Sequence, residues 1–285
     1  MRSLKNSSFT EERPSRRRIL GAVGTIATAA VAGCTGGSGG DESEQTDDES
    51  TDDGADESEG GLPSYDDEAA ASFVLPEDGQ EAANGVQVEM VAENFDIEPS
   101  SEGVSENAGH WHVLVDTDPV EEGEVIPSDD QHLHFGDGSE QAVLDLEPGD
   151  HTLVLQPADG QHRAYPFTDE VDVTVQEASV SFATLEDGDT VESPVEATFE
   201  ASDNVTVEEA GEITQSAGHW HVMVNTEAVE TGTVIPSDDE HLHFGDGSST
   251  VELDLPEGEH DLVLQLANGA HQAMPETDEI TITVE

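Results

Sequence analysis

Histidines are the side chains of this sequence with the clearest capacity for chemistry. All twelve fall into two sets of six, and each member of one set lies 109 positions from its counterpart in the other. Neutral imidazole is a preferred ligand of zinc, copper and nickel. The candidate metal ligands are therefore His110, His112, His132, His134, His151 and His162, and in the second set His219, His221, His241, His243, His260 and His271.

The spacing of the first four histidines in each set favours a shared site. His110 and His112 flank Trp111, and His132 and His134 flank Leu133. Alternate side chains of a β-strand share one face about 7 Å apart, so imidazoles at positions i and i+2 can converge on one ion. If the two strands pair, four imidazoles cluster within one cross-strand spacing. We therefore predict one copper or zinc site in each half of the chain.

Two other interpretations of the histidines remain open. They can serve as hydrogen-bonded structural residues that orient turns with Asp129 or Asp137, or they can have a catalytic or pH-sensing role. Calcium ranks behind copper and zinc. The turns at 128–130 and 136–138 offer oxygen donors, but neither forms a complete Asp-x-Asp-x-Asp-Gly loop.

The sequence assigns no catalytic residue. It contains no Gly-x-Ser-x-Gly, no His-Glu-x-x-His and no phosphate-binding loop, and Cys34 is the only cysteine, which excludes an intrachain disulfide. An enzyme would also need an open metal position and a general base, and no single acid stands out as one. A binding module therefore ranks first, a structural or interaction module of the cell envelope second, and a metal-dependent enzyme third.

The elements that must position the histidines are β-strands. Period-two alternation and many Val, Leu and Thr residues mark them, and Gly, Pro, Asp and Asn separate them. About seven short strands per copy predict two tandem immunoglobulin-like sandwiches. A cupin-like barrel is the alternative fold, but no Glu follows His112 at the cupin spacing. The predicted strands are 71–75, 85–92, 109–116, 131–135, 140–146, 150–156 and 170–176, then 180–184, 195–200, 218–225, 240–244, 250–255, 259–266 and 279–284.

The faces of these strands predict a core. Trp111, Val113 and Val115 share one face of strand 109–116, so this face should be buried and the histidine face should point the other way. The two copies agree at most positions between His110 and Gln156 but at few between Phe73 and Gly109. The segment that bears the histidines has therefore diverged less between the copies, which indicates a constraint beyond maintenance of the fold.

The charge of the chain limits its partners. The 285 residues include 67 Asp and Glu against 7 Lys and Arg, a formal net charge of -60. Nucleic-acid binding is excluded, because it requires cations that displace phosphate counterions. Docking on anionic lipid is disfavoured for the same reason. Such a surface is typical of proteins that fold in molar salt, where self-repulsion is screened.

The first 65 residues predict export and anchoring. Arg16 and Arg17 precede a short apolar stretch that ends in Val31-Ala32-Gly33-Cys34, the pattern of a twin-arginine signal followed by a lipidation site. We predict a signal peptide over 1–33, then lipidated Cys34 and a disordered acidic tether over 34–65. Sandwich repeats follow over 66–177 and 178–285. This order predicts a protein held by lipid at the outer face of the cell membrane, where Asn204 is a candidate for N-glycosylation.

Three segments carry a family resemblance. The His-x-His, His-x-His-Phe-Gly-x-Gly and Pro-Gly-x-His-x-Leu segments resemble domain-of-unknown-function family 4399, over about 100–178 and 209–285. The second copy departs from the Pro-Gly turn, with Pro256-Glu257-Gly258. This family has no established activity, so the resemblance implies a small exported β domain and no defined chemistry. The front of the chain resembles haloarchaeal twin-arginine lipoproteins.

Overall fold

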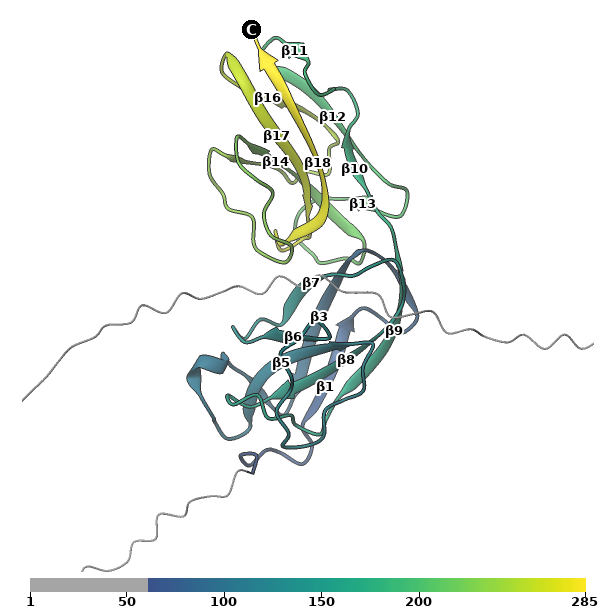
Figure 1. The fold of residues 1–285 in the computed structure, drawn as a ribbon, viewed down its shortest axis with the longest axis vertical. Coiled ribbons are helices and arrows are strands. Elements are labelled where there is room, and N and C mark those ends of the chain that lie inside the picture. Colours follow the sequence, from purple (N-terminus) through teal and green to yellow (C-terminus); the bar gives the residue numbers. More distant parts are fainter. Residues whose placement is uncertain (1–60) are drawn as a thin grey trace, which may run out of the picture. The chain divides into compact units, whose positions relative to one another are not determined.

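The computed structural model describes residues 61–285 (Figure 1). The predicted signal at Arg16 and Arg17, the lipidation residue Cys34 and most of the predicted tether lie outside the described residues. Within them the chain forms two β-sandwich repeats and has no α-helix. Accordingly, no helix in the described part is long and apolar enough to cross a membrane.

The first repeat consists of two sheets. The smaller sheet has the order β1-β3-β7, and the larger has the order β2-β9-β8-β5-β4, with β6 also paired to β5. Strand pairs β2–β9 and β4–β5 are parallel, and the others are antiparallel. The strands are β1 (Ala70–Leu75), β2 (Gln80–Ala83), β3 (Gly85–Glu93), β4 (Asp96–Ile97), β5 (Ala108–Val115), β6 (His132–Phe135), β7 (Gln141–Asp145), β8 (Gly149–Ala158) and β9 (Asp169–Gln176), and a 3-10 turn, η1, spans Ser100–Glu102.

The second repeat has the same topology. Its sheets have the orders β10-β12-β16 and β11-β18-β17-β14-β13, with β15 paired to β14. The strands are β10 (Val180–Phe182), β11 (Thr190–Val191), β12 (Val195–Ala201), β13 (Thr206–Val207), β14 (Ala217–Val224), β15 (His241–Phe244), β16 (Thr250–Leu253), β17 (Gly258–Ala267) and β18 (Ala273–Val284).

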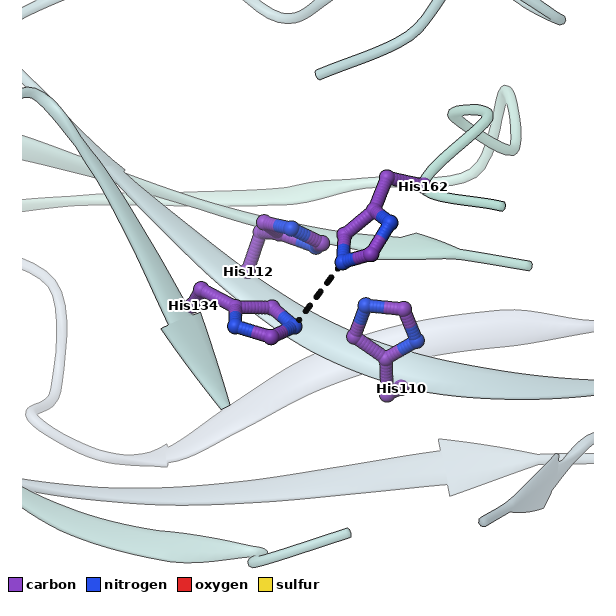
Figure 2. Close-up of side chains that lie close together, drawn as sticks. All are labelled: His110, His112, His134 and His162. Atoms are coloured by element: carbon purple, nitrogen blue, oxygen red, sulfur yellow. Dashed lines mark hydrogen bonds between the residues drawn. The ribbon is translucent and has the colours of Figure 1, made fainter. Parts of the chain in front are cut away.

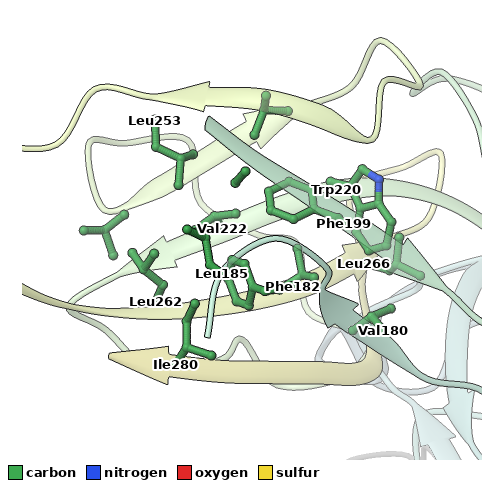
Figure 3. Close-up of a cluster of buried hydrophobic side chains, with 14 of the residues drawn as sticks. Val180, Phe182, Leu185, Phe199, Trp220, Val222, Leu253, Leu262, Leu266 and Ile280 are labelled. Atoms are coloured by element: carbon green, nitrogen blue, oxygen red, sulfur yellow. The ribbon is translucent and has the colours of Figure 1, made fainter. Parts of the chain in front are cut away.

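The immunoglobulin-like prediction is confirmed in both repeats. Each sandwich encloses an apolar core between its sheets, with Trp111 at its centre in the first repeat. Figure 3 shows the second core, in which Trp220 packs against Phe199 with ring centroids 5.4 Å apart. A buried Trp on this central strand is a hallmark of the immunoglobulin sandwich. The predicted core face of the strand, with Val113 and Val115, is therefore correct.

The sequence pattern missed four short edge strands. β2, β4, β11 and β13 have two to four residues each and lie at sheet edges. Segments this short show no alternation, and their strand geometry comes from pairing with β9, β5, β18 and β14. The last strand also begins at Ala273, six residues before the prediction, because β18 pairs with nearly the whole length of β17.

The histidine face of β5 is also buried, which the sequence did not predict. All eight residues of this strand are buried, including Leu114 on the histidine side. A loop over 117–131 folds across this face, and the buried residues Ile126, Ala158 and Ala164 form a second small apolar cluster there. Both faces of the strand are therefore buried, and His110 and His112 lie beneath this loop.

Candidate metal centre

Four histidines converge on the outer face of the larger sheet in the first repeat (Figure 2). His110 and His112 come from β5, His134 from β6 and His162 from the turn after β8. One ring nitrogen from each lies within 4.8 Å of those of the other three. Because His112 pairs with His134 across the two strands, strand pairing alone brings the first three histidines together. Only the fourth, His162, comes from a loop.

A strained turn positions His162. Its backbone has a φ of 63°, in the left-handed region that residues other than glycine seldom adopt. Its N–H donates to the Asp159 carbonyl at 2.8 Å, and its carbonyl accepts from the Ile126 N–H at 2.8 Å. A Cβ at Gly160 would overlap the backbone of Gly103, so only glycine fits this close approach. A rare backbone conformation that the surrounding contacts maintain in this way is typical of functional positions.

Gly136 makes room for the ring of His134. A Cβ at this glycine would collide with the Cε1 and Nε2 atoms of the His134 imidazole. Gly245 has the same relation to His243 in the second repeat. The His-x-His-Phe-Gly motif therefore has a steric reason, which the sequence alone did not reveal although the glycine recurs in both copies.

Burial favours the neutral form of three of these imidazoles, those of His110, His112 and His134. His110 and His112 are almost fully buried, and this burial, followed by the neighbouring imidazoles, lowers the pKa of His110 to about 4 and that of His112 to about 2. Partial burial of its ring also lowers the pKa of His134. A neutral imidazole has one unprotonated nitrogen, which is the form that binds a metal.

Several buried ring nitrogens have no hydrogen-bond partner. They are both nitrogens of His110 and Nδ1 of His112, and in the second repeat Nδ1 of His219 and of His221. A buried polar atom without a partner costs about 1–3 kcal/mol. Coordination would satisfy a nitrogen of this kind, so the orphaned atoms fit the donor set of a metal site.

The second repeat reproduces the cluster. One nitrogen from each of four histidines lies within 4.8 Å of the others, and the residues are His219, His221, His243 and His271. The Nε2 atoms of His219 and His221 are 3.1 Å apart. Burial lowers the pKa of His219 to about 4 and that of His221 to about 3. His271 repeats the strained backbone with a φ of 64°.

The donor set indicates the class of metal. Within residues 61–285 both groups consist of imidazoles alone, with no thiolate or carboxylate. Zinc bonded at 2.0–2.1 Å would hold nitrogens about 3.4 Å apart in a tetrahedron. Imidazole suits zinc, copper and nickel, whereas calcium prefers oxygen donors. The arrangement can therefore hold a divalent transition metal.

His132 and His241 lie outside the two clusters. The Nδ1 atom of His132 is 2.7 Å from Asp129 Oδ1, and that of His241 is 2.7 Å from Asp238 Oδ1. They share a strand face with His134 and His243, but their cross-strand partners are Leu114 and Met223 and not histidines. The sequence predicts both residues as metal ligands; the structure instead pairs them with carboxylates that orient a turn.

His151 and His260 also lie apart from the clusters. His151 lies near the start of β8, where one ring nitrogen contacts the Glu147 carbonyl at 2.8 Å and the other contacts Asp116 at 2.9 Å. His260 contacts the Pro256 carbonyl at 2.8 Å. Immunoglobulin domains place a tyrosine at this corner with a hydrogen bond back to the upstream backbone. These two histidines therefore brace a corner of the sandwich, and the predicted ligand set narrows from six to four per repeat.

Two further predicted sites have ordinary turn contacts. Asp137 Oδ1 accepts the Ser139 N–H at 2.9 Å, and Asp129 Oδ1 accepts the Gln131 N–H at 3.0 Å. These carboxylates serve their own turns, and neither belongs to a metal-ligand group in the described residues. Asn204 is half-buried and donates its side-chain amide to the Glu177 carbonyl at 3.1 Å.

Comparisons with known proteins give the family and distant structural likenesses. A search of curated proteins returns no match. The fibronectin(III)-like modules of Clostridium thermocellum CbhA are 16% identical, with 75% of this chain and 94% of that chain covered and a TM-score of 0.26. The tandem Ig repeats of Dlar are 10% identical, with 75% and 97% covered and a TM-score of 0.23. Likenesses this distant say nothing about ligand or partner.

The family profile described as Domain of unknown function (DUF4399) matches residues 88–176 and 197–285, which include all eight clustered histidines. The chain therefore belongs to this family and carries two tandem copies of its domain.

Proposed function

We propose that this protein is a two-site metal-binding lipoprotein of the cell surface, which holds one copper or zinc ion in each repeat through four histidines. The observation that carries the proposal is the burial of His110 and His112 with orphaned ring nitrogens beside two further imidazoles. The same arrangement recurs in the second repeat, so it does not depend on the conformation of a single loop.

The position of the cluster favours exchangeable binding over a structural role. Each sandwich has its own apolar core on the opposite face of β5 or β14, which includes Trp111 or Trp220. Folding therefore does not depend on the ion, in contrast to small zinc domains that are unfolded without metal. His134 and His243 are exposed, so solvent and a small chelator can reach one side of each site.

Attachment to the membrane is the second part of the proposal. It depends on Arg16, Arg17 and the lipobox cysteine Cys34 in the sequence. An acidic tether of about thirty residues would hold the two sites away from the bilayer, because a chain with one sign of charge extends. In this position the protein would collect or buffer metal from outside the cell.

Elemental mass spectrometry tests the metal sites. The untagged protein would be purified from a high-salt host without chelator, and we expect about two copper or zinc ions per chain. The variant His134→Ala with His243→Ala removes the exposed ligand of each site and should lose metal while keeping both cores. Its control, His132→Ala with His241→Ala, removes two histidines outside the clusters and should retain two ions.

Absence of metal from the wild-type protein, with no uptake on titration with copper(II) or zinc(II), would overturn the proposal. The histidines would then serve a structural or interaction module of the cell envelope. Equal metal loss in the control variant would show that binding does not depend on the four-histidine clusters.

A further inference from the structure

A buried glutamine lies beside the histidine cluster in each repeat. Strand β5 runs between β6 and β8, and His134, His112 and Gln156 form one row across these three strands. Side chains directly opposite one another on paired strands share a face of the sheet. In the second repeat Gln265 has the same register with His221. The two glutamines are only 0% and 1% exposed, although neither belongs to a metal-ligand group in the described residues.

Backbone groups occupy the side-chain amide of Gln156. Its Oε1 accepts the Val120 N–H at 2.9 Å, and its Nε2 donates to the Val120 carbonyl at 2.8 Å and to the Tyr165 carbonyl at 2.9 Å. A side-chain amide nitrogen has two N–H groups, so both are used. Gln156 therefore joins two segments of the chain and is not placed to bind an ion.

The second repeat has the same three bonds. Gln265 Oε1 accepts the Val229 N–H at 2.9 Å, and Gln265 Nε2 donates to the carbonyls of Val229 at 2.8 Å and of Met274 at 2.9 Å. Met274 stands where the first repeat has Tyr165. The bonds persist through this change of side chain because they use only the backbone of the two segments.

The two joined segments are the loop over 117–131, which covers the histidine face, and the segment after β8 that carries His162. They also bond to each other directly. The Ile126 N–H donates to the His162 carbonyl at 2.8 Å, the Ala164 N–H to the Glu124 carbonyl at 2.8 Å and the Gly123 N–H to the Ala164 carbonyl at 2.9 Å. The equivalent bonds of the second repeat run from Ile235 to His271 at 2.9 Å, from Ala273 to Thr233 at 2.8 Å and from Gly232 to Ala273 at 2.9 Å. In each repeat the covering loop and the fourth histidine therefore belong to one hydrogen-bonded unit.

We infer that Gln156 and Gln265 are positioning residues of the metal sites, which fix the covering loop and with it the fourth histidine over the other three. The inference rests on the proposed function. Strand pairing already holds the first three ligands, so the fourth is the ligand whose position depends on this unit. Residues that orient a metal ligand typically change affinity by about 10-fold to 100-fold, and we expect about tenfold because the turn around His162 keeps its own bonds.

Metal release from a single-site protein tests the inference. The full chain with His243→Ala and His271→Asn retains only the first site, because asparagine tolerates the left-handed backbone but is a poor ligand for copper or zinc. This protein, loaded with copper(II) or zinc(II), would be mixed with excess chelator in molar potassium chloride. Gln156→Leu keeps a side chain of similar size without hydrogen bonds and should speed release of the ion about tenfold.

The matched control changes the adjacent residue on the other face of β8. Leu155 packs in the apolar core, so Leu155→Ala lowers the stability of the repeat from the side away from the histidines. Denaturant unfolding would show that both variants fold with reduced stability. Only Gln156→Leu should release metal faster, and equally fast release from the control would overturn the inference.

A double-mutant cycle separates positioning from general stabilisation. His162→Asn removes the fourth ligand of the first site. If Gln156 acts through His162, Gln156→Leu should weaken metal binding about tenfold when His162 is present and less than about twofold in the His162→Asn protein. Equal weakening in both backgrounds would show that the glutamine only stabilises the fold.

Hydrogen exchange tests the same link without metal. In the metal-free protein, Gln156→Leu should speed exchange about tenfold at the amides of Ile126 and Ala164, which bond the covering loop to the histidine segment. The amide of Val113, in the middle of β5, should keep its wild-type rate. Unchanged exchange at Ile126 and Ala164 would overturn the role of Gln156.

The outcomes distinguish this inference from the proposed function. Wild-type rates of metal release in Gln156→Leu would overturn the inference while the metal sites stand. Failure of the wild-type chain to bind either metal would overturn the proposed function, and hydrogen exchange would still decide whether Gln156 fixes the covering loop. If Gln156→Leu does not fold, Gln156→Ser replaces it with the same expected results, because the shorter side chain leaves room for water to bond the freed backbone groups.

Discussion

The Nε2 atoms of His134 and His162 lie 3.2 Å apart, although 28 positions separate the residues in the chain. Two imidazole nitrogens approach this closely only if one donates a proton to the other or both bind a common ion. The neighbouring ring of His110 has no hydrogen-bond partner for either nitrogen, so a proton shared by one pair does not satisfy the cluster. A metal ion would satisfy all four rings at once.

Substitution of Gly136 should weaken the first site without unfolding the repeat. In Gly136→Ala the new Cβ displaces the His134 ring from the cluster. We expect metal affinity at this site to fall at least about tenfold, as for other residues that orient a metal ligand. Competition titration would measure the change, and the intact second repeat serves as the internal control. Unchanged affinity would show that His134 is not a ligand.

Metal-free protein should lose stability as the pH falls from about 6.5 toward 4. Burial holds the pKa of His110, His112, His219 and His221 well below the value of 6.5 for an exposed histidine. In this pH range the unfolded chain therefore binds more protons than the folded chain. The contribution of these histidines to the free energy of unfolding is fully present above pH 6.5 and declines below it. Each proton taken up contributes a slope of about 1.4 kcal/mol per pH unit.

Denaturant unfolding in molar salt at pH 7 and pH 5 would measure this loss. The His110→Gln variant, which removes one of the buried imidazoles, should show a shallower decline than the wild-type protein. A free energy of unfolding that stays constant between these pH values would contradict the neutral, buried state of the cluster.

The corner histidine of the first repeat should affect stability and leave metal binding intact. His151→Ala removes contacts to the Glu147 carbonyl and to Asp116, and we expect a loss of about 1–3 kcal/mol in the free energy of unfolding. Metal content should remain about two ions per chain. Loss of an ion from this variant, with the repeat still folded, would return His151 to the set of candidate ligands.

Membrane attachment should depend on one thiol. Cys34→Ser removes the group that would accept the lipid, so the protein should move from the membrane fraction to the medium while export continues. Lysine in place of Arg16 and Arg17 should instead block export and retain the protein in the cell. Fractionation of cells that express each variant would measure both effects. Membrane retention of the Cys34→Ser variant would contradict lipid anchoring.

Local pattern was enough to predict most of the fold. Alternation along 109–116 identified the core face with Trp111, and the turn residues placed the long strands other than β18 within a few positions of their observed ends. Two-residue edge strands such as β4 escaped prediction because their geometry depends on pairing with a neighbour. The burial of Leu114 escaped it because strand alternation does not show that the loop after the strand folds back over this face.

The sequence alone shows that the histidines belong to two repeats and that pairs spaced i and i+2 share a face. That follows from strand geometry and needs no knowledge of what the strands contact. Which histidines meet depends on the tertiary fold. His162 joins the cluster because a turn folds back over the sheet, whereas His132 and His151 are engaged by Asp129 and by the corner of the sandwich. Contacts of this kind depend on how loops close, and loop closure leaves no periodic signal in a sequence.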